Sequence, residues 1–175
     1  LHDPTLGLLL GQHITPRHAG LLGYLLIASS NLEQALQRLD RYQQLIYDVT
    51  PMQCRQGEGY VDLVWGAEQG RPGNLVDETS ITALVQFCRD ITGQHLQPLL
   101  VQFINPPPAD LAPYHTYFAC PVLFDQAETM VRVASAALTW PLRAADPALG
   151  EVMERHAETL LAKLPQEQPL IEQLR

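Results

Sequence analysis

The first clear change in the hydrophobic pattern lies around residues 21–36. An apolar run from Leu21 to Ala28 gives way abruptly to the polar tripeptide Ser29-Ser30-Asn31. A helix that spans a membrane needs about 20 apolar residues, so this run is too short to be a membrane anchor. The tetrapeptide from Ser30 to Glu33 fits a capping box, in which two side chains satisfy free backbone N–H groups at a helix start. We therefore predict two helices joined at the serine pair.

The helical pattern continues on both sides of this joint. Downstream, apolar side chains recur every three or four residues, which is the pattern of one face of an amphipathic helix: Leu32, Ala35, Leu36, Leu39, Tyr42, Leu45, Ile46 and Val49. We expect a mostly apolar helix over about 17–28 and an amphipathic one over about 31–48, both packed in the core. Upstream, Asp3-Pro4 and Thr15-Pro16 each place a capping residue before proline, and the first predicts a short helix to about residue 12.

After Pro51 the pattern changes to short alternating segments. Residues 52–66 indicate two strands around a turn at 56–59, and LLVQFI at 99–104 indicates a third strand. Two further strands, PVLFD at 121–125 and TMVRVA at 129–134, are predicted to form a second hairpin.

Three helices are expected among and after these strands. One carries Ile81, Val85 and Cys88 and stops at Gly93, a short one covers 112–119, and a long one runs from Asp146-Pro147 to residue 164. Residues 67–74 are expected to form a loop. Hairpins mixed with helices indicate an α+β fold. We expect N-terminal helices, a small antiparallel sheet of about five strands covered by helices, and a long C-terminal helix.

Four glycines lie in the N-terminal helices: Gly7, Gly11, Gly20 and Gly23. They do not form a phosphate-binding loop, because no strand precedes them and no Lys follows. Close approach of helices is the simpler interpretation.

Composition restricts the class of partner. The chain has 175 residues, 46% hydrophobic and 17% charged, with a formal net charge of -8. This suits one globular domain, while an acidic surface disfavours binding to nucleic acid or anionic membranes. We assign residues 1–164 to one domain. Because the chain begins at Leu1 and ends in PLIEQLR, we expect a part of a longer protein, with 165–175 as the start of a linker.

Few residues suggest catalysis or metal binding. Cys54, Cys88 and Cys120 are far apart and form no CxxC motif, which favours reduced thiols in a cytoplasmic protein. His115 and Cys120 lie five positions apart, a spacing that is only a weak metal signal. We expect no catalytic residues, no metal and no cofactor. Glu151, Glu154 and Glu158 are expected on a solvated helix face.

Aromatic side chains are the better lead. A small-molecule pocket is mostly apolar with a few polar groups, and Tyr and Trp combine both properties. The candidate ligand-binding residues are Tyr24, Tyr42, Trp65, Phe103 and His115. For each of them, packing in the core is the alternative interpretation.

Two long segments resemble a known family. DPTLGLLLGQHITPRHAGLLGYLLIASSNLEQALQRLDRYQQLI at 3–46 resembles the opening of the arabinose-binding-type N-terminal domain of AraC/XylS transcription regulators. PLLVQFINPPPADLAPYHTYFACPVLFDQAETMVRVASAALTWPL at 98–142 resembles later parts of that domain in the same order. The opening matches are Asp3, Pro4, Gly7, Leu8, Gly11, Gly20, Gly23, Tyr24, Ser29, Ser30, Leu32, Ala35 and Leu36.

The resemblance implies the sensor half of a bacterial regulator. Such a domain binds a small-molecule effector, forms a homodimer, and controls DNA only through a C-terminal helix-turn-helix half that these residues do not include. The resemblance does not identify any individual ligand-binding residue in this chain. Two alternatives stay open: an enzyme that uses Cys88, Cys120 or His115, and a dimerisation module without a ligand.

Overall fold

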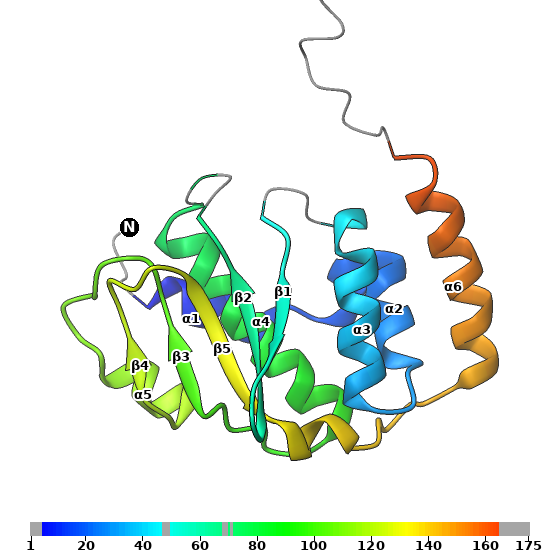
Figure 1. The fold of residues 1–175 in the computed structure, drawn as a ribbon. Coiled ribbons are helices and arrows are strands. Elements are labelled where there is room, and N and C mark those ends of the chain that lie inside the picture. The colour runs from blue at the N-terminus through cyan, green and yellow to red at the C-terminus, as the bar shows by residue number, and fades with distance from the viewer. Residues whose placement is uncertain (1–4, 47–49, 68–69, 71, 165–175) are drawn as a thin grey trace, which may run out of the picture.

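The structure, a computed structural model, describes residues 5–46, 50–67, 70 and 72–164 (Figure 1). Its N-terminal part is helical: α1 (Leu6–His13), the 3-10 helix η1 (Pro16–Ala19), α2 (Gly20–Ile27), α3 (Leu32–Tyr42) and the 3-10 helix η2 (Gln43–Leu45). Strands and helices then alternate: β1 (Gln53–Gln56), β2 (Tyr60–Trp65), α4 (Asn74–Thr92), β3 (Leu100–Gln102), α5 (Ala112–Phe118), β4 (Val122–Leu123), β5 (Thr129–Ala134), the 3-10 helix η3 (Ser135–Thr139) and α6 (Pro147–Leu161).

The five strands form one sheet in the order β1-β2-β5-β3-β4. All neighbours are antiparallel except β3 and β4, which are parallel. The α+β prediction is confirmed, but the predicted hairpin of 121–125 with 129–134 is wrong. Strand β5 is apolar and largely buried, which suits the centre of a sheet. The two-residue β4 lies at the edge, where short strands are common.

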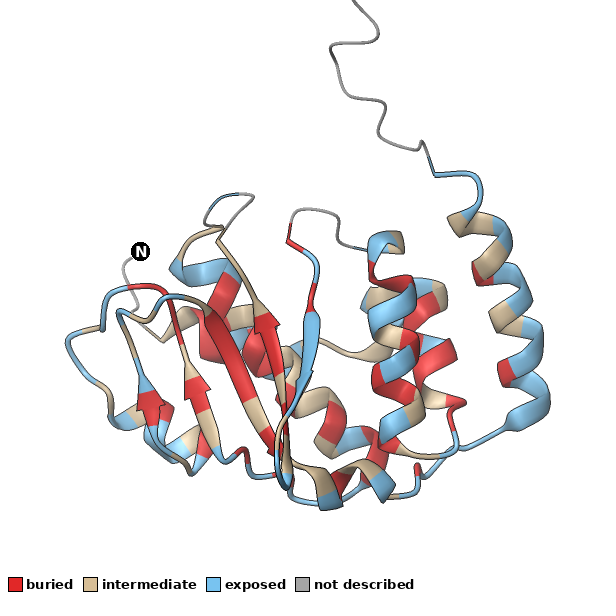
Figure 2. Cartoon of the chain, in the orientation of Figure 1, coloured by how far each residue is buried: buried red, intermediate tan, exposed pale blue. Residues whose placement is uncertain are grey.

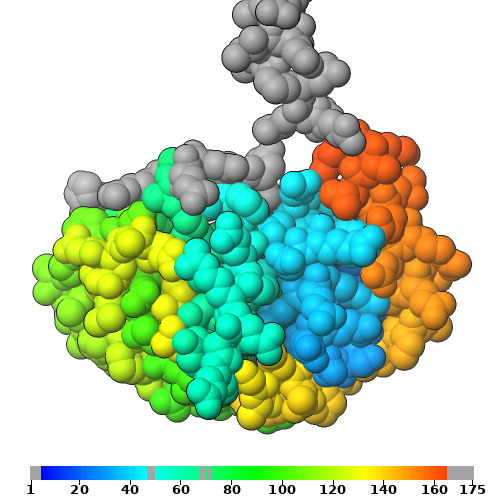
Figure 3. Space-filling view, in the orientation of Figure 1, coloured from blue at the N-terminus to red at the C-terminus, as the bar shows by residue number. Residues whose placement is uncertain are grey.

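The elements form two packed groups that share side chains. Helix α4 crosses one face of the sheet, with α1 beside it, while α2, α3 and α6 stand together beyond β1 (Figure 1). In the space-filling view the β1–β2 hairpin lies between β5 and the helices α2 and α3 (Figure 3). Leu39 and Phe87 pack against both hydrophobic clusters, so the two groups form one continuous core, with exposed residues along the outer side of α6 (Figure 2).

The starts of α3 and α6 follow the predicted capping logic, with a shift at α3. The predicted start at Asp3-Pro4 lies outside the described residues, and α1 begins at Leu6. The cap of α3 is Asn31 rather than Ser30: Gln34 N donates to Asn31 Oδ1 at 2.9 Å, and Ser30 N donates to Gln34 Oε1 at 2.8 Å. The cap therefore lies one residue later than predicted, since Asn is at least as good a cap as Ser, and the Gln34 side chain bonds to the residue before the cap. At α6 the prediction is confirmed, since Leu149 N donates to Asp146 Oδ1 at 3.0 Å.

Helix α3 ends at Tyr42, earlier than the predicted residue 48. Gln43 explains the end. Its Oε1 accepts from Met52 N at 2.5 Å, and its Nε2 donates to Met52 O at 3.1 Å. The side chain thus bonds to both backbone polar groups of Met52 and fixes the entry to β1 against the end of the helix. Residues 47–49 of the predicted helix lie outside the described residues.

The predicted solvated glutamate face holds only in part, because Glu154 and Glu158 bond to α3 while their side chains stay 38% and 42% exposed. Arg38, which is 7% exposed, donates to Glu154 Oε2 at 2.9 Å and to Ser29 Oγ at 2.9 Å. Tyr42 donates a hydrogen bond to Glu158. Burial is the main cause that raises the pKa of Tyr42, and this hydrogen bond is the second. Glu151, the third glutamate, is exposed. These bonds attach α6 to α3 through charged groups as well as apolar ones.

The predicted role of glycines in helix packing is confirmed at α1. A Cβ atom at Gly11 would lie 2.5 Å from Thr82 Cβ, and one at Gly7 would lie 2.5 Å from Glu78 Cβ. Real side chains do not approach so closely, so α1 can contact α4 only because both positions lack a side chain.

We expect Gly11→Ala to lower the free energy of unfolding by about 1–3 kcal/mol, the usual cost of overpacking. The loss should appear although Ala favours helix by about 1 kcal/mol over Gly. Urea unfolding followed by circular dichroism measures it. The control is Leu10→Ala on the same helix, where Leu10 is 45% exposed. Equal stability of G11A and wild type would contradict the close contact.

Candidate functional site

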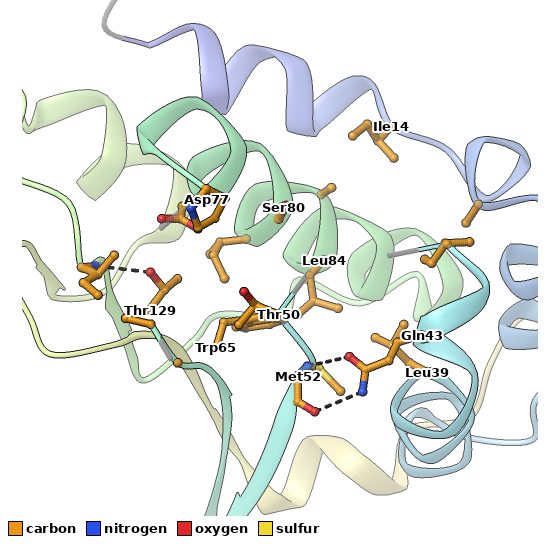
Figure 4. A pocket seen from close by; sticks show the side chains of 18 of the residues that line it. Ile14, Leu39, Gln43, Thr50, Met52, Trp65, Asp77, Ser80, Leu84 and Thr129 are labelled. Atoms are coloured by element: carbon orange, nitrogen blue, oxygen red, sulfur yellow. Dashed lines mark hydrogen bonds between the residues drawn. The ribbon is translucent and has the colours of Figure 1, made fainter. Parts of the chain in front are cut away.

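A cavity of about 370 Å³ lies among α4, one end of the sheet and the ends of α1 and α3 (Figure 4). This size falls within the range of small-molecule pockets. Apolar side chains dominate the wall, and polar ones are few. The wall includes His18, Ala19, Leu39, Ile46, Thr50, Trp65, Asp77, Ser80, Ile81, Ala83, Leu84 and Thr129.

Secondary structure explains why these side chains meet. Asp77, Ile81 and Leu84 lie at helical spacing on α4, so they share the face that looks toward the cavity. Trp65 and Thr129 are directly opposed in the β2–β5 ladder. Opposed residues of antiparallel strands point to the same face of a sheet, which brings both side chains to the cavity.

Besides His18, Gln43 and Ser80, three polar side chains stand in this mostly apolar wall: Asp77, Thr129 and Thr50. Asp77 is 7% exposed, and its Oδ2 accepts from Asn105 Nδ2 at 2.5 Å. Burial raises the pKa of the Asp77 carboxyl, and the bond from Asn105 partly opposes this. Thr129 Oγ1 accepts from Ile104 N at 3.3 Å. Thr50 is 5% exposed, and its hydroxyl has no hydrogen-bond partner among the described residues.

Of the five residues predicted to bind ligand, only Trp65 lines this cavity. Tyr42 is buried between α3 and α6, and Tyr24 is 49% exposed on α2. Phe103 is fully buried among the rings of the α5 region. His115 is exposed on α5. The structure therefore does not bring these four together with Trp65, and their ligand role stays a prediction.

Sequence reasoning did not select Asp77, Thr50 or Thr129. One signal for Asp77 was available: it occupies the same helical stripe as Ile81 and Leu84, where a carboxylate is out of place. Its position near a helix start gave a simpler explanation. For the two threonines the sequence held no comparable signal, because their position depends on contacts between distant segments.

The cysteines show no sign of activation. Burial raises the pKa of Cys88 to about 12 and that of Cys120 to about 11, and it also raises the pKa of Cys54. Reactive thiols have lowered pKa values instead. His115 Nδ1 lies 3.5 Å from the backbone carbonyl oxygen of Cys120, not from its thiol. These observations disfavour the Cys–His enzyme.

Neither a cluster of metal ligands nor a membrane-spanning helix is found among the described residues. Within them, no three His, Cys, Asp or Glu side chains converge as metal ligands would. No helix in this part of the chain combines the length and hydropathy needed to cross a membrane.

Known transcription regulators are among the proteins similar to this chain. The Ornithine utilization regulator of Pseudomonas aeruginosa is 29% identical over 175 residues, covering 99% of this chain and 52% of the relative. The crystal structure of transcriptional regulator CdpR from Pseudomonas aeruginosa has a similar fold, with a TM-score of 0.72 and 19% identity. That match covers 87% of this chain and 50% of CdpR. The chain thus spans about half the length of both proteins.

The family comparison covers most of the chain. Residues 1–142 match the family described as the arabinose-binding domain of AraC transcription regulator, N-term. This includes α1 to η3 and every strand of the sheet. The resemblance inferred from the sequence is confirmed: the chain belongs to the family of arabinose-binding domains found at the N-terminus of AraC transcription regulators.

Proposed function

We propose that this domain is the sensor of a bacterial transcription regulator and that the cavity beside α4 binds its small-molecule effector. The observation that carries the proposal is the cavity itself, which joins an apolar wall to a few buried polar groups, Asp77, Thr50 and Thr129. This is the usual make-up of a small-molecule site. The family membership supports a sensing role, and the raised thiol pKa values favour binding over catalysis.

DNA binding is the function that we assign to a part of the regulator beyond this domain. With a net charge of -8, the chain is a poor ligand for DNA, so we assign DNA binding to a separate helix-turn-helix half. Residues 1–164 are then the effector-binding and dimerisation domain, and 165–175 begin the linker. A regulator of this kind works beside DNA in the cytoplasm.

The walls of the cavity suggest how binding is transmitted. His18, Ala19 and Ile46 line the cavity and also a neighbouring groove. The far side of that groove is formed by Leu160, Lys163 and Leu164 at the end of α6. An effector that contacts η1 and η2 is thus one side chain away from the helix that leads toward the linker. It shifts that helix only if it binds one arrangement better than another.

A second copy of the chain is the proposed partner of α6. Leu149 is 43% exposed and Val152 is 55% exposed, one turn apart on the helix. Side chains at this spacing share a face, and burying them against the same face of another subunit would form a twofold-symmetric contact. A dimerisation module without effector is the alternative, and it differs from a sensor in showing a dimer but no response to any ligand.

Effector binding is tested by a thermal-shift screen with amino acids (ornithine included, after the relative's name), sugars, and aromatic and fatty acids. A ligand at 100 times its Kd adds about 2.7 kcal/mol, which raises the Tm of a domain this size by roughly 5–10 °C. We expect Ala83→Trp, which fills the cavity, to abolish the shift. The control is Leu75→Trp on the exposed side of α4, where Leu75 is 47% exposed. A ligand whose shift survives in A83W binds elsewhere and contradicts the proposed site.

Dimerisation is tested by sedimentation. We expect Val152→Glu to convert a dimeric chain to monomer in analytical ultracentrifugation, because a charge placed in an apolar contact is costly. Glu151→Gln, on an exposed neighbouring position, is the control and should leave the dimer intact. A wild-type chain that sediments as a monomer at all concentrations would refute dimerisation through α6.

A further inference from the structure

We propose that the effector carries a protonated amine and that Asp77 is its counterion in the cavity. The inference rests on the proposed function, since it names the chemical class of ligand for the same site. The position of Asp77, the charges around it and the side chains that face it support the assignment.

Asp77 is a buried carboxylate with half of its capacity unused. Its Oδ2 accepts from Asn105, and among the described residues Oδ1 has no hydrogen bond. No Lys or Arg is found among the described residues of the cavity wall. A carboxylate buried without a cation is unfavourable, and a ligand ammonium group would remove that cost by forming a charge-assisted hydrogen bond.

The neighbouring residue adds to the negative potential. Glu78 is 5% exposed and hydrogen-bonds with Tyr114, on a side of α4 that does not line the cavity. Burial raises the pKa of the Glu78 carboxyl, the bond with Tyr114 opposes this, and the neighbouring charge of Asp77 adds to the rise. Two adjacent acids in a weakly polar region attract a cation and repel an anion more strongly than either acid alone.

The helix start does not account for this placement. Negative charge in the first turn of a helix is favourable, but the benefit is available at the surface of a protein. It does not require a side chain that is 7% exposed and directed to a cavity. The hydroxyl of Thr50 is a second and independent sign of a ligand, because it is buried beside the cavity without a partner among the described residues.

The rest of the wall defines the body of the ligand. Trp65 lines the cavity, and an indole ring suits an ammonium group or a hydrocarbon chain. Ile81, Leu84 and Leu39 provide aliphatic surface (Figure 4). A small primary amine with an apolar body, and with one polar group in reach of Thr50, fits these features. An apolar carboxylic acid does not, because its charge would meet Asp77.

The test uses matched probes on the 175-residue chain. Hexylamine, 1-hexanol and hexanoate differ only in the head group, as do 2-phenylethylamine, 2-phenylethanol and phenylacetate. We expect calorimetry at pH 7 to give the amines at least about tenfold higher affinity than the alcohols, as hydrogen bonds to charged groups predict, and to give the acids no measurable binding.

Variants isolate the carboxylate. Asp77→Asn keeps an oxygen for Asn105 but removes the charge, so it should lose the preference for amines, retain the affinity for alcohols and leave the Tm of the free chain undiminished. Asp77→Glu keeps the charge and should keep the preference. Glu78→Gln is the matched comparison: it removes the adjacent buried charge outside the cavity and should weaken the preference for amines without abolishing it.

The outcomes separate the two proposals. If alcohols bind as well as amines and A83W abolishes the binding, Asp77 is not a counterion of the ligand, while the cavity remains the effector site. Amines that bind D77N as well as wild type would also overturn the counterion role of Asp77, as would no binding by any amine. A broad screen in which every ligand is indifferent to A83W would overturn the cavity as the effector site itself.

Discussion

The contact between α1 and α4 is the constraint on which the rest of the structure depends. Helix α4 lies against the sheet with Ile81 and Val85 in the core, and α1 reaches its other side through Gly7 and Gly11. Close-packed interiors leave little room for adjustment. This contact therefore fixes both the distance of α4 from the sheet and the rotation of α4 about its own axis. The rotation in turn decides that Asp77 faces the cavity while Glu78 faces Tyr114.

The cavity lies where the two packed groups of the domain meet. On one side are α4 and the ends of β2 and β5, and on the other are η1, η2 and the end of α3. Gln43 connects the groups by bonding to both backbone polar groups of Met52. A ligand in this position contacts both groups at once. The cavity is therefore a suitable site for a ligand that changes how the two groups are positioned relative to each other.

Local patterns in the sequence predicted local structure well. The hairpin of β1 and β2 and the cap at Asp146 each depend on residues close together in the chain. The glycines of α1 were recognised as packing positions, although their partners on α4 lie about seventy residues away. The pairing of β5 with β2 and β3 was missed because it is decided by burial across the whole sheet. For the same reason Glu154 and Glu158 were assigned to solvent: their partners on α3 lie more than a hundred residues away. Of the site, only Trp65 followed from residue type; Asp77 required the rotation of α4.

The wall that the cavity shares with the groove at the end of α6 has a thermodynamic consequence. If the effector changes the preferred position of that helix, anything that holds the helix must change effector affinity by the same factor, since linkage is reciprocal. His18, Ala19 and Ile46 are the side chains through which this exchange would pass. Under the proposed function, a Kd measured on these 175 residues is therefore the value for an unrestrained helix, and any partner that holds the helix would shift it.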